Sequence, residues 1–136
     1  MSATSDRSIR VLVLDDEPMI LMDIEDCLTE AGFTPVTART ADRAMKAIGT
    51  AAPDVALLDV NLGHGETCEA VARYLHGQGV PFALHTGDLD RQGELVRQLD
   101  VPILPKPSSM DDIVKQVRRL SALPDAQDDT PEPVSG

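Results

Sequence analysis

Aromatic residues are scarce in this sequence, and their scarcity argues against one class of function. They make up 2% of the 136 residues, as two phenylalanines, one tyrosine and no tryptophan. Single-stranded nucleic acid is held largely by bases stacked on aromatic rings, for which this chain offers no platform. Basic residues are also few, with 12 Lys and Arg against 23 Asp and Glu and a formal net charge of -11. Because phosphate contacts depend on Lys and Arg, we predict no nucleic-acid partner and no anionic-membrane partner.

Cysteine is sparse as well, since Cys27 and Cys68 lie far apart and form no CxxC pair. They make no disulfide framework, and this usage suits a reducing compartment. No apolar run approaches the roughly 20 residues of a membrane span. The first eight residues lack the apolar segment of a secretory signal. We therefore predict a cytoplasmic location.

The length is that of about one domain, and we expect three segments. Residues 1–8 are predicted to be a flexible leader, and residues 9–123 the folded domain. Residues 124–136 combine prolines and acidic residues with little apolar surface. Such a segment cannot offset the entropy of ordering, so we predict a disordered, acidic, proline-containing tail.

Short apolar runs alternate with helical patterns along residues 9–123. Five runs are typical of buried strands: Ile9–Leu14, Thr34–Ala38, Asp54–Asp59, Val80–Thr86 and Val101–Pro105. Helices are expected from Pro18, after the cap Thr40, from about Glu66 to His76, from about Leu89 to Leu99 and after the cap Ser109. In the third helix, Ala70, Val71, Tyr74 and Leu75 are predicted to face inward. This order predicts an α/β fold of the (βα)5 type, an open, doubly wound, parallel five-stranded sheet.

Polar residues follow the ends of four of the predicted strands. They are Asp15 and Asp16, Asp59, Thr86 and Lys106. Ligands of such sheets bind beyond the carboxyl ends of the strands, where these side chains would meet. Taken singly, each has an ordinary explanation as a helix cap, a turn residue or a surface lysine. Such residues at four strand ends are hard to attribute to coincidence.

Three carboxylates brought together would repel one another and raise at least one pKa unless a cation joined them. Mg2+ is the natural candidate, because it binds through one or two carboxylates, water and phosphate oxygens. Lys106 could pair with a carboxylate or a phosphoryl oxygen, and Thr86 could donate a hydrogen bond to that oxygen. These groups suit phosphoryl transfer, in which a carboxylate can itself be the nucleophile.

Four motifs, in order, resemble those of the receiver domains of two-component response regulators. They are VLVLDDEP (Val11–Pro18), VALLDVNL (Val55–Leu62), LHTG around Thr86 and LPKP (Leu104–Pro107). The resemblance spans about residues 9–123 and implies the flavodoxin-like receiver fold.

By this resemblance, Asp59 would accept a phosphoryl group from a phosphohistidine on a histidine kinase or histidine phosphotransfer protein. Lys106 would pair with Asp59 and then with the phosphoryl group, and Thr86 would swing toward a phosphoryl oxygen. The implied Mg2+ ligands are the side chains of Asp16 and Asp59, the backbone carbonyl of Asn61 and, mainly through water, Asp15. One departure is Ile103, at a position where receivers commonly carry an aromatic residue.

The resemblance also implies a signalling domain that catalyses only its own phosphorylation and dephosphorylation. We expect no output domain after Leu123, and therefore a stand-alone regulator that signals through contacts with a downstream protein or acts as a phosphate sink. The alternative is a haloacid-dehalogenase-like phosphatase with Asp15 as nucleophile and the late acidic pair Asp111 and Asp112. That family requires a second aspartate where this chain has Glu17.

Overall fold

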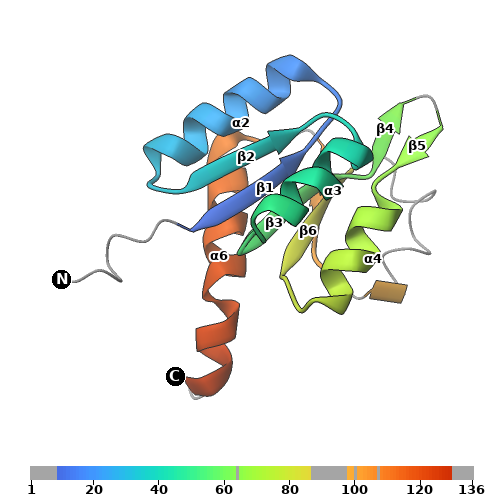
Figure 1. Ribbon diagram of the computed structural model, residues 1–136. Coiled ribbons are helices and arrows are strands. Elements are labelled where there is room, and N and C mark those ends of the chain that lie inside the picture. The colour runs from blue at the N-terminus through green and yellow to red at the C-terminus, as the bar shows by residue number, and fades with distance from the viewer. Residues whose placement is uncertain (1–8, 64, 87–97, 100, 107, 130–136) are drawn as a thin grey trace.

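A twisted parallel sheet of five strands forms the centre of the molecule (Figure 1). The computed structural model describes residues 9–63, 65–86, 98–99, 101–106 and 108–129. The strands are β1 (Arg10–Leu14), β2 (Thr34–Ala38), β3 (Val55–Asp59), β6 (Phe82–Thr86) and β7 (Ile103–Pro105), in the order β2-β1-β3-β6-β7. Every neighbouring pair is parallel. The predicted α/β architecture is confirmed.

In the described part of the chain, four helices with assigned bounds connect or follow these strands. They are α2 (Pro18–Glu30), α3 (Ala41–Thr50), α4 (Glu69–Gly77) and α6 (Met110–Asp129). Two predicted caps are present, because the Thr40 hydroxyl accepts a hydrogen bond from the Arg43 amide and the Ser109 hydroxyl accepts one from the Asp112 amide. Each cap satisfies an amide that the first helical turn would otherwise leave without a partner. Of the helix predicted at about Leu89–Leu99, only residues 98–99 lie within the described part, and both are helical.

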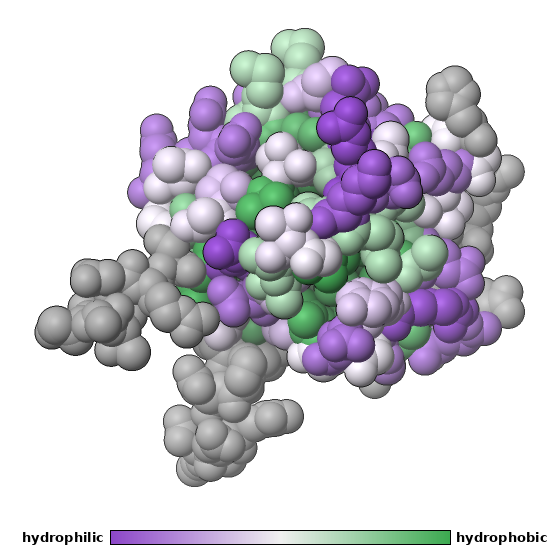
Figure 2. Space-filling view, viewed as in Figure 1, coloured by the Kyte–Doolittle hydropathy of each residue, from purple (hydrophilic) through white to green (hydrophobic). Residues whose placement is uncertain are grey.

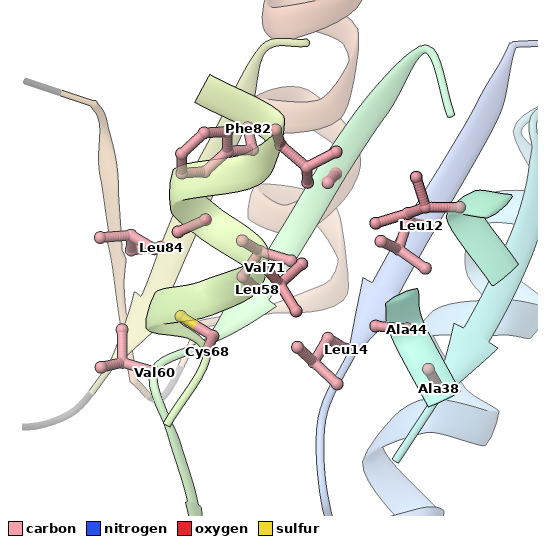
Figure 3. Packing of buried hydrophobic residues seen from close by; sticks show 14 of the residues in the cluster. Leu12, Leu14, Ala38, Ala44, Leu58, Val60, Cys68, Val71, Phe82 and Leu84 are labelled. Atoms are coloured by element: carbon pink, nitrogen blue, oxygen red, sulfur yellow. The ribbon is translucent and has the colours of Figure 1, made fainter. Parts of the chain in front are cut away.

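The two faces of the sheet are covered by different helices, because side chains alternate along each strand. On one face Leu12, Leu58 and Leu84 pack against α3 and α4 (Figure 3). On the other face Val13 and Leu57 pack against α2 and α6. Strands buried on both sides explain the nearly continuous apolar runs of the sequence. The hydrophobic residues of each helix therefore hold the sheet from one side only.

A two-stranded antiparallel hairpin follows β3 and was not predicted. It consists of β4 (Asn61–Gly63) and β5 (Glu66–Thr67), so α4 begins at Glu69 and not at about Glu66. The register of α4 also differs from the prediction. Val71, Ala72 and Leu75 are buried, whereas Ala70 is exposed and Tyr74 is 42% exposed.

The last helix continues to Asp129, beyond Leu123, where we predicted the folded domain to end. This continuation includes Pro124, which removes one backbone hydrogen bond of the helix and is unfavourable in a helix interior, so the sequence did not indicate it. The remaining tail, 130–136, and the predicted leader, 1–8, lie outside the described residues.

Hydrophilic residues spread around the rim of the face that carries α3 and α4, and hydrophobic residues show mainly toward its middle (Figure 2). Among the helices that the structure describes, none combines the length and the apolar composition that crossing a bilayer requires.

Replacing Leu58 by Ala tests the packing of the central strand. Leu58 is fully buried in β3, so the variant loses apolar contacts and leaves a cavity. We expect the free energy of unfolding to fall by about 2–5 kcal/mol, measured by urea denaturation. The control is Met19→Ala, because Met19 is 77% exposed and its truncation should change stability by less than about 0.5 kcal/mol. Equal effects of the two substitutions would contradict the described core.

Candidate functional site

The strand order brings the predicted site residues to one edge of the sheet. Asp15 directly follows β1, Asp59 ends β3, Thr86 ends β6 and Lys106 directly follows β7. The β1, β3, β6 and β7 strands are neighbours in parallel register, so their carboxyl ends lie side by side. At this edge a pocket of about 350 Å³ is lined by Asp16, Glu17, Asp59, Asn61, Gly63, Thr86 and Lys106.

Three carboxylates converge at this pocket. Asp15, Asp16 and Asp59 each offer one oxygen, and these oxygens lie within 4.8 Å of one another. Asp15 is 1% exposed and Asp59 is 3% exposed. One oxygen of each, Oδ2, is buried and has no hydrogen-bond partner among the residues that the structure describes. Buried carboxylate oxygens without partners are costly, and a hard cation that takes oxygen ligands would satisfy them. The donor set therefore fits Mg2+.

Lys106 supplies positive charge to the same cluster. Its Nζ lies 3.0 Å from Asp59 Oδ1 and 4.0 Å from Asp15 Oδ2. The Lys106 backbone amide donates to the Thr86 carbonyl at 3.0 Å, which continues the pairing of β7 with β6 up to the site. Asp15 is fixed from the other side, because its Oδ1 accepts the Glu17 amide at 2.9 Å. The backbone thus sets the position of the Asp15 carboxylate and the point in the chain from which the Lys106 side chain reaches the cluster.

Burial has the largest effect on the pKa values of Asp15 and Asp59. It raises the pKa of Asp59 to about 6, although the hydrogen bond from Lys106 acts in the opposite direction. The negative charge of Asp15 raises the Asp59 pKa further. Burial likewise raises the pKa of Asp15, against the lowering effects of the Glu17 amide and Lys106. One lysine therefore compensates only part of the cost of ionising this cluster.

His85 lies on the opposite side of β6 from Thr86, on the sheet face that Asp59 occupies. It is the register partner of Asp59 in the neighbouring strand and is buried. Burial, and after it the charge of Lys106, lowers the pKa of His85 to about 4. At neutral pH this imidazole is uncharged, so it adds no second cation to the site.

Gly63 and Glu17 line the pocket although the sequence did not indicate them. Gly63 has a positive φ of 84°. A Cβ at this position would lie 3.3 Å from Asp16 Oδ2, so the absence of a side chain lets the hairpin approach the acidic cluster. The glycines of the Gly63-His64-Gly65 segment were a signal for a tight turn. They could not indicate that this turn would lie against Asp16.

The fold and this edge of the sheet identify the class of protein. The family model described as "Response regulator receiver domain" matches residues 11–118. The chain therefore belongs to the receiver-domain family of response regulators, which are signalling domains. Receiver domains generally bind Mg2+ at an acidic pocket, and this chain has a cluster of three acidic residues, Asp15, Asp16 and Asp59.

Curated relatives and solved structures agree with this assignment. The transcriptional regulatory protein KdpE of Mycobacterium tuberculosis is 30% identical over 111 residues, which cover 79% of this chain and 49% of KdpE. The response regulator MprA of Mycobacterium ulcerans is 29% identical over 90% of this chain and 54% of MprA. The chain thus spans about half the length of these curated relatives. A CheY-like receiver domain protein from Methanospirillum hungatei JF-1 has a TM-score of 0.80 at 19% identity, over 89% of this chain and 99% of that chain.

The residues of the alternative phosphatase hypothesis are not assembled in the described part of the pocket. Asp111 and Asp112 lie in the first turn of α6 and do not line it. Asp15 is buried and is not among the residues that line it. Family membership and this placement favour the receiver.

Stability should depend on pH through Asp59. Its folded pKa of about 6 lies above the ordinary aspartate value of 3.8, so the folded state binds this proton more tightly between those values. Without Mg2+, the Asp59 contribution to the free energy of unfolding should therefore fall as pH rises from about 4 to about 6. Asp59→Asn removes this contribution, and we expect the variant to be about 1–3 kcal/mol more stable than wild type at pH 7.

The measurement is urea unfolding of both proteins at pH 5 and pH 7, with and without Mg2+. Added Mg2+ should stabilise wild type more than the variant, because binding to the folded state shifts unfolding by mass action. A metal-free Asp59→Asn protein that is less stable than wild type at pH 7 would show that burial is not the main influence on the pKa of Asp59.

Proposed function

We propose that this domain accepts a phosphoryl group on Asp59 from a phosphohistidine of a histidine kinase or histidine phosphotransfer protein. The observation that carries the proposal is the Asp59 carboxylate at the sheet edge, 3.0 Å from the Lys106 ammonium and bordering an open pocket. In the transfer, an Asp59 oxygen forms a bond to phosphorus and the P–N bond of the donor breaks. The donor imidazole keeps the electron pair and takes up a proton.

Mg2+ is the proposed cofactor of this reaction. The side chains of Asp16 and Asp59 and the backbone carbonyl of Asn61 would hold it, with Asp15 acting mainly through water. The ion would neutralise charge on the phosphoryl oxygens during transfer. The buried Oδ2 atoms of Asp15 and Asp59, which lack hydrogen-bond partners among the described residues, support this assignment.

Lys106 and Thr86 would act on the phosphoryl group after it arrives. Lys106 is about one-quarter exposed, so its ammonium can turn from Asp59 toward a phosphoryl oxygen without a new burial cost. Thr86 lines the pocket at the end of β6 and can donate a hydrogen bond to such an oxygen. Its movement would carry the signal to the surface around β6 and β7. Ile103 replaces the aromatic side chain that often accompanies this movement.

The output of the phosphorylated domain is proposed to be contact with a downstream protein, or storage of phosphoryl groups as a sink. The absence of a nucleic-acid partner stays a prediction, since KdpE is named a transcriptional regulatory protein. A cytoplasmic location stays a prediction that rests on the use of cysteine.

Asp59→Asn should abolish phosphorylation by acetyl phosphate in Mg2+, because an amide cannot form the acyl phosphate. Wild type should take up one phosphoryl group per chain, detected by intact-protein mass spectrometry. The matched control is Asp42→Asn, on the exposed surface of α3, which should be labelled like wild type. Full labelling of the Asp59 variant would disprove the assignment, and steady turnover of a generic phosphate ester would favour the phosphatase.

A further inference from the structure

The β4–β5 hairpin is built into the domain directly after the proposed phosphoacceptor. Asn61 pairs with Thr67 and Gly63 pairs with Glu66. At its base the Cys68 amide donates to the Val60 carbonyl at 3.1 Å, and both residues are fully buried. The hairpin is therefore anchored at one end to β3 and at the other to the start of α4, and it projects as a separate green ribbon beside the sheet edge (Figure 1).

The hairpin forms a wall shared by two pockets. Asn61 and Gly63 line the acidic pocket of about 350 Å³. Leu62 and Glu66 line a larger pocket of about 720 Å³ between α2, the end of β2 and α3. Leu62 also belongs to the buried cluster on the α3 and α4 face. A shift of the hairpin would therefore change the acidic pocket on one side and the larger pocket on the other.

Glu66 connects the hairpin to helix α3. Its Oε2 accepts a hydrogen bond from the backbone amide of Ala41, the first residue of α3, at 3.1 Å. The first amides of a helix have no partner within the helix, and the helix dipole favours a negative group there. The Thr40 hydroxyl already accepts the Arg43 amide, so Glu66 satisfies a second amide of the first turn of α3, from outside the helix.

A short chain of contacts then leads from this cap to the acidic cluster. Glu66 pairs with Gly63 across the hairpin, and the Cα of Gly63 lies so close to Asp16 that a Cβ would be 3.3 Å from Oδ2. We propose that Glu66 is a positioning residue that fastens the hairpin to α3 and thereby fixes Asn61 and Gly63 against the proposed metal and phosphoryl site. The inference rests on the proposed function of Asp59.

The consequence is control over how long the phosphoryl group persists. In hydrolysis a water oxygen forms a bond to phosphorus and the P–O bond to Asp59 breaks. The carboxylate keeps the electron pair, and inorganic phosphate and a proton are released. A fastened hairpin keeps Asn61 and Gly63 at the pocket wall, so it limits the positions from which water can attack. A loosened hairpin admits water and displaces the Asn61 carbonyl.

The experiment compares wild type with Glu66→Ala, Glu66→Gln and the control Glu69→Ala. Gln keeps a carbonyl oxygen that can accept the Ala41 amide, whereas Ala cannot. Glu69 is the matched control, because it is an exposed glutamate three residues away that pairs with Arg73 on α4. Three quantities are measured: the half-life of the phosphoryl group after labelling with acetyl phosphate, the Mg2+ dissociation constant by calorimetry, and hydrogen exchange of the Ala41 amide without metal.

Glu66→Ala should shorten the half-life and weaken Mg2+ binding, each by about three- to tenfold, the effect expected of one hydrogen bond. Exchange of the Ala41 amide should become faster by a similar factor. Glu66→Gln should restore most of all three quantities, and Glu69→Ala should leave them unchanged. This pattern distinguishes a positioning role of Glu66 from a general loss of stability. A general loss of stability would not be restored by Glu66→Gln, and it would also be caused by Glu69→Ala.

The proposal is overturned if the Ala41 amide exchanges faster in Glu66→Ala than in wild type while the Mg2+ affinity and the phosphoryl half-life of the variant match those of wild type. It is also overturned if Gln behaves like Ala. Failure of the proposed function gives a different result, because wild type itself would then take up no phosphoryl group. In that case Mg2+ affinity and Ala41 exchange still decide whether Glu66 fastens the hairpin to the acidic site.

Discussion

The interaction on which the site depends is the contact of Lys106 with two buried aspartates. Its ammonium lies 3.0 Å from Asp59 and 4.0 Å from Asp15, yet burial still raises the pKa of both carboxyl groups. One cation is too little for three carboxylates that lie this close together. The site is thus left with a deficit of positive charge, which a divalent ion would fill. This deficit links the fold to the proposed chemistry.

The strand order of the sheet brings these charged groups together. Asp15, Asp59 and Lys106 come from three different strands, and the order β2-β1-β3-β6-β7 brings their carboxyl ends to one edge. Two apolar layers hold those strands from both faces, with α3 and α4 on one side and α2 and α6 on the other. The strands position the charged groups, while the hairpin after β3 supplies one wall of the pocket.

The sequence allowed the strands and the strand-end residues to be predicted because both follow simple rules. Apolar runs buried on both faces are recognisable, and parallel strands must bring Asp15, Asp59, Thr86 and Lys106 to one edge. The hairpin was missed because β4 and β5 are only three and two residues long, too short for periodicity to show. The prediction that Tyr74 in α4 faces the core was wrong, because its aromatic ring was counted as hydrophobic although its hydroxyl group is polar. In the structure Ala72 is buried instead. The contact of Glu66 with α3 depends on tertiary structure alone.

The most direct test of the central claim is to locate the phosphoryl group on the unmodified chain. The protein is treated with acetyl phosphate and Mg2+, reduced with borohydride and digested, and the peptides are analysed by mass spectrometry. Borohydride converts an aspartyl phosphate to homoserine, so the account predicts homoserine at position 59 and at no other aspartate. Homoserine at position 15 or 16, or no conversion at all, would contradict it.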